Sequence, residues 1–75
     1  MTERLNPREI MRATCKDYGM TLDQLISHDK RYHFVKARKE CSKRMLEAGM
    51  GIADIAYYLN RKYHNIAYYF NGKAK

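Results

Sequence analysis

The feature that most constrains this chain is an octapeptide that occurs almost unchanged twice near its end. Residues 55–62 read IAYYLNRK, and residues 66–73 read IAYYFNGK, eleven positions later. Eleven residues at about 100° each return to within roughly 20° of the starting direction. One continuous helix would therefore carry a single apolar face, whereas two short helices would each use the same face against one core. The residues of that face are Ile52, Ile55, Leu59, Tyr63, Ile66 and Phe70.

The residues between the two copies favour two helices. Asn60 belongs to the few residue types that tolerate the left-handed conformation in which many helices end. Residues 59–65 also gather polar and basic side chains where a turn would need them. We therefore predict a helix over residues 52–59, a turn over 60–62 and a second helix over 63–71. A continuous helix is the alternative, and it would suit a coiled-coil dimer.

The preceding part of the chain also predicts helices. Asn6 and Pro7 form a typical helix start, and Gly19 is placed to end that helix. A short second helix is expected from Thr21 to about Ser27, followed by a polar loop over 28–31. From Tyr32 onward, apolar residues recur at helical steps at Phe34, Ala37, Cys41, Met45 and Ala48. We predict one all-α domain over residues 1–75, a bundle of about five helices with a C-terminal helix-turn-helix.

The positive charge of the chain is concentrated in its middle and at its end. The net charge is +7, and residues 30–44 contain seven basic side chains against one acidic one. Such clustering favours a polyanionic partner, nucleic acid first and an anionic membrane second. No apolar run approaches the roughly 18 residues of a membrane span, and no leader segment is recognisable. We therefore expect a soluble cytoplasmic protein that is not bound to a membrane.

The sequence does not suggest a metal site or an enzyme. Cys15 and Cys41 are too few for a disulfide framework and are expected to be buried, reduced thiols. Their spacing to His28 and His33 matches no compact zinc pattern. No nucleophile–His–carboxylate pattern occurs, and a chain of 75 residues leaves little volume for a substrate pocket. We predict no cofactor, no catalysis and no small-molecule substrate.

Several segments occur in an order that is characteristic of one family. Residues 19–25 read GMTLDQL, residues 34–38 read FVKAR, and residues 52–61 read IADIAYYLNR. Together they resemble the C-terminal DNA-binding domain of the bacterial chromosomal replication initiator, DnaA. Its corresponding segments are G-I-x-x-x-D-L, V-A-R-x-R and S-L-x-E-I-G-x-x-F-G-R, and Ile66 falls where its signature R-D-H-T-T-V has Val. The resemblance implies a Trp-repressor-like helix-turn-helix with an added basic loop that binds duplex DNA.

Two departures from this family limit what the resemblance implies. Residues 62–65 read KYHN where the family has Asp-His-Thr-Thr, so we do not expect the same DNA target. The phosphate-binding motif G-x-x-x-x-G-K-[ST] of the initiator's ATPase module does not occur in this sequence. The resemblance therefore implies a free-standing, nucleoid-associated domain of phage or mobile-element type. Such a domain would act at an origin or in transcription regulation.

A recognition helix that starts near Tyr63 would place its first turn in the major groove. Asn65 can form two hydrogen bonds with adenine, and His64 can donate to guanine. The predicted base-reading residues are Arg61, Lys62, His64, Asn65 and Tyr68. Lys30 or Arg31 falls where the family has its minor-groove arginine. The residues predicted to contact phosphates or the minor groove are Lys30, Arg31, Lys36, Arg38, Lys39, Lys43 and Arg44.

Other partners stay open at this point. A continuous last helix would favour a small basic adaptor that binds an acidic host protein through Ile52, Ile55, Leu59, Ile66 and Phe70. Charge does not separate DNA from structured RNA. A homodimer on DNA is compatible with the sequence but is not required by it.

Overall fold

The structure, a computed structural model, describes residues 6–71 and contains five helices in this part of the chain. They are α1 (Pro7–Tyr18), α2 (Leu22–Leu25), α3 (Tyr32–Glu47), α4 (Ile52–Tyr58) and α5 (Tyr63–Asn71). Residues 6–71 contain no strand, so the predicted all-α class and the five helices are confirmed. The predicted domain spans residues 1–75, of which residues 1–5 and 72–75, including Lys73 and Lys75 of the basic end, lie outside the described residues.

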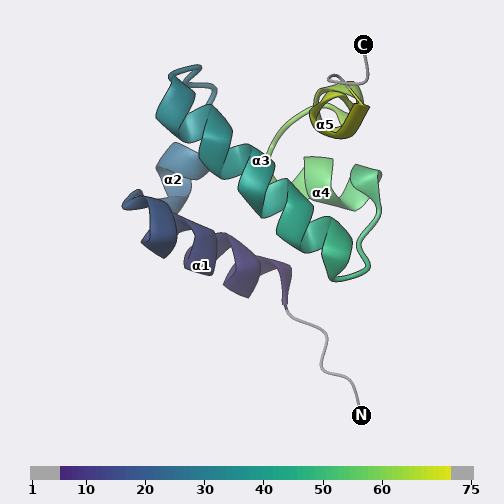
Figure 1. The fold of residues 1–75 in the computed structure, drawn as a ribbon, viewed down its shortest axis with the longest axis horizontal. Coiled ribbons are helices and arrows are strands. Elements are labelled where there is room, and N and C mark those ends of the chain that lie inside the picture. Colours follow the sequence, from purple (N-terminus) through teal and green to yellow (C-terminus); the bar gives the residue numbers. More distant parts are fainter. Residues whose placement is uncertain (1–5, 72–75) are drawn as a thin grey trace.

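The long helix α3 lies at the centre of the fold and contacts each of the other four helices. Figure 1 shows α1 and α2 on one side of α3, and α4 and α5 on the other. One apolar core joins the two sides. Its fully buried side chains come from four of the helices and from the residue that ends α4: Leu25, Ala37, Cys41, Met45, Ile55, Leu59 and Ile66.

Sequence signals at the helix ends correspond to hydrogen bonds in the structure. The Asn6 side chain accepts a hydrogen bond from the backbone of Arg8 at 2.8 Å, and this starts α1. Thr21 and Gln24 form a reciprocal capping box at the start of α2. Helix α2 ends at Leu25, two residues before the predicted end, because buried Arg38 bonds the carbonyl oxygens of Leu25 and Ser27.

The chain breaks its helix at Asn60, as predicted. Asn60 has a φ of 56°, and it is the one residue other than glycine with a positive φ in the described part of the chain. Its backbone N–H donates to Tyr57 O at 3.2 Å, and the N–H of Arg61 donates to Ala56 O at 2.9 Å. This pair of bonds is the Schellman arrangement that satisfies the last carbonyls of a helix. The two-helix prediction is confirmed, and the continuous helix is wrong.

The repeated octapeptide has the same pattern of exposure in both helices. Ile55 and Ile66 are both fully buried, whereas Tyr57 and Tyr68 are 79% and 66% exposed. The tyrosines that follow them in each copy are half-buried and pack against the core. The repeat therefore encodes two helices that dock on one core through equivalent faces.

The same packing removes the surface that was predicted for an adaptor. Ile55, Leu59 and Ile66 are fully buried within the chain itself, and Ile52 and Phe70 pack against them. Ile55, Leu59 and Ile66 therefore cannot contact a partner, and the five side chains do not form one exposed face. The predicted partner face is wrong because it depended on a continuous helix, whereas the adaptor role itself stays a prediction.

Candidate nucleic-acid interface

Helix α5 projects several of the predicted base-reading residues into solvent. Ile66 anchors the helix in the core, and the opposite side carries Tyr68, which is 66% exposed. Tyr63, the first residue of the helix, is 58% exposed. Lys62 and His64 are exposed as well. Lys62, His64 and Tyr68 therefore lie where a ligand can approach α5 from outside.

Asn65 lies at the edge of this exposed side and is half-buried. It is the third residue of α5, and its backbone N–H donates to Lys62 O at 3.0 Å. Asn65 is thus inside the first turn of the helix and is not the residue that precedes it. Its side chain lines a hollow at the start of the helix.

This hollow, which we call the basic hollow, has a volume of about 660 Å³ and joins two distant segments of the chain. The loop after α2 contributes one wall, and the end of α4 with the first turn of α5 contributes the other. Its lining residues are His28, Lys30, Ala56, Tyr57, Asn60, Arg61, Lys62 and Asn65. Cations from both walls face one concave space, and such an arrangement attracts an anion more strongly than scattered charges do.

Arg61 lines the basic hollow but is directed toward its floor. Its Nη1 donates to Ser27 O at 3.4 Å, and its Nε is buried with no protein partner. The side chain therefore links the turn before α5 to the loop after α2. The structure does not place the Arg61 guanidinium on the exposed side of α5, where a base reader would need to be.

Arg38 requires a correction, because it is fully buried and cannot contact a phosphate. Its Nε donates to Leu25 O at 2.7 Å, Nη1 to Asp29 O at 2.8 Å and Nη2 to Ser27 O at 2.6 Å. Burial lowers the pKa of Arg38, and the nearby charge of Arg61 lowers it further. A guanidinium still stays charged at neutral pH. The side chain holds the loop that carries Lys30 in place.

The loop that Arg38 holds presents Lys30 and Arg31 differently. Lys30 is exposed and lines the basic hollow. Arg31 is also exposed, but its Nη2 donates to Asp29 Oδ2 at 2.7 Å and its Nε contacts both Asp29 oxygens. These hydrogen bonds from Arg31 lower the pKa of Asp29. Lys30 is therefore the loop cation without a carboxylate partner in the described residues.

The basic residues of α3 divide into two groups. Arg44 donates to Asp17 Oδ2 at 2.8 Å and to Glu40 Oε2 at 3.0 Å, so two carboxylates already balance its charge. The predicted phosphate contact by Arg44 is not supported by this geometry. Lys36, Lys39 and Lys43 are exposed, but none of the three lines the basic hollow.

The sequence did not predict one polar contact that fixes the end of α1. His33 Nε2 donates to Tyr18 O at 2.7 Å, and the imidazole packs against the rings of Tyr18 and Phe34. His33 and Tyr18 are fifteen residues apart and belong to different helices. Nothing in their local sequence indicates this pairing.

Residues 6–71 contain no group of three or more His, Cys, Asp or Glu side chains that could hold a metal ion. Cys15 and Cys41 are buried in the core as free thiols, as predicted. Within the same described range, no helix combines the length and the apolar character that a membrane span requires. Comparisons of the chain with protein-family models, with curated proteins and with solved structures found no match.

Proposed function

We propose that this protein binds double-stranded DNA in a sequence-specific manner and is not an enzyme. In this proposal it is a free-standing relative of the replication initiator's DNA-binding domain, acting at an origin or in transcription regulation. The observation that carries the proposal is the position of Lys62 and Asn65. Lys62 directly precedes α5, Asn65 lies in its first turn, and both line the basic hollow. Polar side chains at the start of α5 therefore lie next to the lysines of the basic hollow. A helix that docks in a major groove needs both polar groups for the bases and cations for the phosphates.

Base reading is assigned to the first turn of α5. Asn65 can form two hydrogen bonds with adenine, and His64 can donate to guanine N7 or O6. Lys62 can reach a base edge or the neighbouring phosphate, and Tyr68 lies one turn further along the exposed side. A good bidentate contact contributes about 1–3 kcal/mol of discrimination between bases. The family's target sequence does not apply, because Lys62-Tyr63-His64-Asn65 replaces its Asp-His-Thr-Thr.

Phosphate binding is assigned to the cations around the basic hollow. Lys30 and Lys62 are exposed and line the hollow, whereas Arg31, next to Lys30 in the chain, is bound to Asp29. Arg38 and Arg44 are not available, because one is buried and the other is bound to carboxylates. About two phosphate contacts at the hollow then remain, from Lys30 and Lys62. They predict that log K falls against log salt with a slope of about −2.

The test starts with selection of binding sites from a random duplex library at about 150 mM salt, a concentration at which non-specific binding is weak. We expect a defined motif. Asn65→Ala should then cost about 1–3 kcal/mol on that motif and leave binding to unrelated duplex unchanged. Lys62→Glu should weaken binding to all sequences.

Lys16→Glu is the matched control for Lys62→Glu. Lys16 is exposed on α1, and Figure 1 shows α1 on the opposite side of α3 from α5. If both charge reversals weaken binding equally, the overall charge and not the basic hollow drives association. A selection that yields no motif would refute sequence-specific binding. Tighter binding to an RNA duplex of the same sequence would show that the partner is RNA and not DNA.

A further inference from the structure

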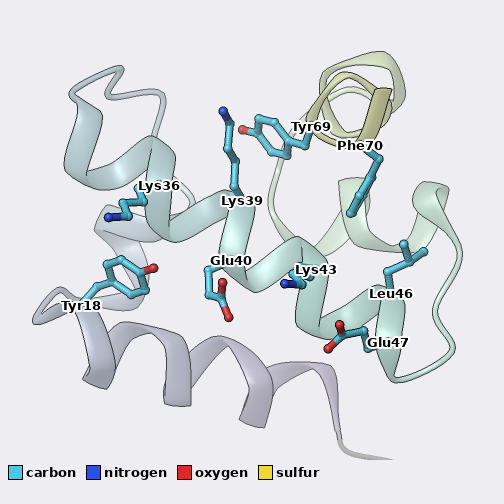
Figure 2. Close-up of a pocket in the computed structure, with 9 residues that line it drawn as sticks. All are labelled: Tyr18, Lys36, Lys39, Glu40, Lys43, Leu46, Glu47, Tyr69 and Phe70. Carbon is cyan, nitrogen blue, oxygen red and sulfur yellow. The ribbon is translucent and has the colours of Figure 1, made fainter. Parts of the chain in front are cut away.

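The described residues form a second concavity, which we call the lysine–aromatic groove. It has a volume of about 490 Å³ and lies between the exposed side of α3 and the C-terminal half of α5. Figure 2 shows Lys39 directed toward Tyr69, and Phe70 directed toward Leu46. Its main lining residues are Lys36, Lys39, Lys43, Leu46, Tyr69 and Phe70.

The groove and the basic hollow have no lining residue in common. Lys62 and Asn65 line the hollow at the start of α5, whereas Tyr69 and Phe70 line the groove toward its other end. The groove and the hollow are therefore two distinct concavities at opposite ends of α5.

The charges of the groove favour an acidic partner. Lys36, Lys39 and Lys43 follow one another at steps of three and four residues, so they form one row that is about 10 Å long. None of them forms an ion pair within residues 6–71. Glu40 also lines the groove, but Arg44 binds its carboxylate at 3.0 Å. Glu47 is then the remaining acidic group against three lysines.

The apolar part of the groove favours a protein over a nucleic acid. Leu46 is 40% exposed although it is a large aliphatic side chain. Phe70 lies opposite Leu46, and the ring of Tyr69 packs under the Lys39 ammonium at 6.0 Å. A phosphate backbone has no apolar group to place against Leu46 and Phe70. An amphipathic helix offers such a group on the same face as its carboxylates.

We propose that the lysine–aromatic groove binds an acidic amphipathic helix of a partner protein. One large apolar side chain of that helix sits between Leu46 and Phe70. Carboxylates spaced by one turn pair with the lysine row, since a helix of the partner has the same spacing as α3. This binding goes beyond the proposed DNA binding and does not depend on it.

The probe for this site is a synthetic helical peptide of about 14 residues, which spans about 20 Å. It carries one Leu, with Glu three and four residues away on the same face. Its affinity for the full chain is measured by fluorescence anisotropy without DNA. A second peptide has Gln in place of each Glu, and we expect it to bind about tenfold more weakly because the ion pairs are lost.

Variants of the protein locate the site. The double variant Lys39→Glu/Lys43→Glu should weaken peptide binding by about tenfold or more, and Leu46→Ala by about fivefold. Lys16→Glu and Lys62→Glu, which change charge outside the groove, should leave it unchanged. If the double variant fails to fold, Lys39→Gln/Lys43→Gln replaces it. Peptide-induced NMR shifts of the unmodified protein, expected at Leu46 and Phe70, need no variant.

Four results would overturn the proposal. The first is equal affinity for the Glu and Gln peptides, and the second is a loss of peptide binding in Lys16→Glu as large as that in the double variant. The third is no binding at millimolar peptide. The fourth is a loss of DNA binding in the double variant as large as that in Lys62→Glu. The last result would make the groove part of the DNA surface. Failure of DNA selection alone would leave peptide binding intact, so the two proposals can fail separately.

Discussion

Replacement of Arg38 by Met tests how the fold holds its basic loop. Met keeps a long unbranched side chain but removes the guanidinium, which donates to Leu25 O, Ser27 O and Asp29 O at 2.6–2.8 Å. The carbonyl oxygens of Leu25 and Asp29 then lose this donor, and Ser27 O keeps only the 3.4 Å hydrogen bond from Arg61. The loop with Lys30 should then loosen, and the protein should become less stable.

The expected size of this effect follows from the burial of each bond. The bond to Leu25 O is buried, and a buried acceptor without a donor costs about 1–3 kcal/mol. The bonds to Ser27 O and Asp29 O are partly buried, so water replaces them at a cost of about 0.5–1 kcal/mol each. Met carries no charge, so the variant no longer has the desolvation cost of the buried Arg38 guanidinium, and this offsets part of the lost stability. We expect a net destabilisation of about 2–3 kcal/mol.

Urea denaturation followed by far-UV circular dichroism measures this difference. A domain of this size has a stability of about 4–11 kcal/mol, so the variant should still fold at 25 °C. Lys36→Met is the matched control. It makes the same exchange at an exposed site of the same helix, where we expect a change within about 0.5 kcal/mol. If Arg38→Met unfolds at the same urea concentration as the unmodified protein, Arg38 does not anchor the loop.

Four further predictions concern three single positions. Asn60→Ala should destabilise the protein by about 1–2 kcal/mol relative to Asn60→Gly, because φ is positive there; equal urea midpoints would contradict this. Asp29→Asn keeps an acceptor for the backbone of Arg31 but frees its guanidinium, so the salt slope of DNA binding should become steeper by about one unit. The stabilisation from Asp29, whose pKa is lowered by Arg31, should be complete above pH 3.8 and disappear as the pH falls through the lowered value. Burial raises the pKa of Cys41 from 9.0 to about 11, so its thiol ionises first in the unfolded chain. As the pH rises from 9.0 to about 11, the free energy of unfolding of the unmodified protein should therefore fall by up to about 1.4 kcal/mol per pH unit more than that of Cys41→Ala. Equal decreases for both proteins in urea denaturation would contradict this.

The sequence was sufficient for the helices and for the turn between the last two. Helix starts and ends depend on residues close in the chain, such as Thr21 with Gln24, so local patterns predict them well. The position of Asn60 between two copies of one apolar pattern predicted the break for the same reason. The repeated apolar faces pack on one core, in which Ile55 and Ile66 are both fully buried.

The division of the basic residues could not be predicted in the same way. Charge alone assigned Arg38 to the surface, but it lies four residues after Phe34 and three before Cys41, on the buried stripe of α3. That spacing was a usable signal of burial. The hydrogen-bond acceptors of Arg38 are backbone carbonyl oxygens of another segment, and no pattern of side chains in the sequence predicts them. The pairing of Arg44 with Asp17 likewise depends on how α1 packs on α3.

The carbonyl oxygen of Ser27 accepts hydrogen bonds from both Arg38 and Arg61. One peptide group thus connects the loop that carries Lys30 to Arg61 in the turn before α5. If both parts contact a duplex, as proposed above, the distance between the two contacts is fixed by the fold. We therefore expect a DNA target with invariant spacing, in which inserting a single base pair between the two contacted regions abolishes recognition.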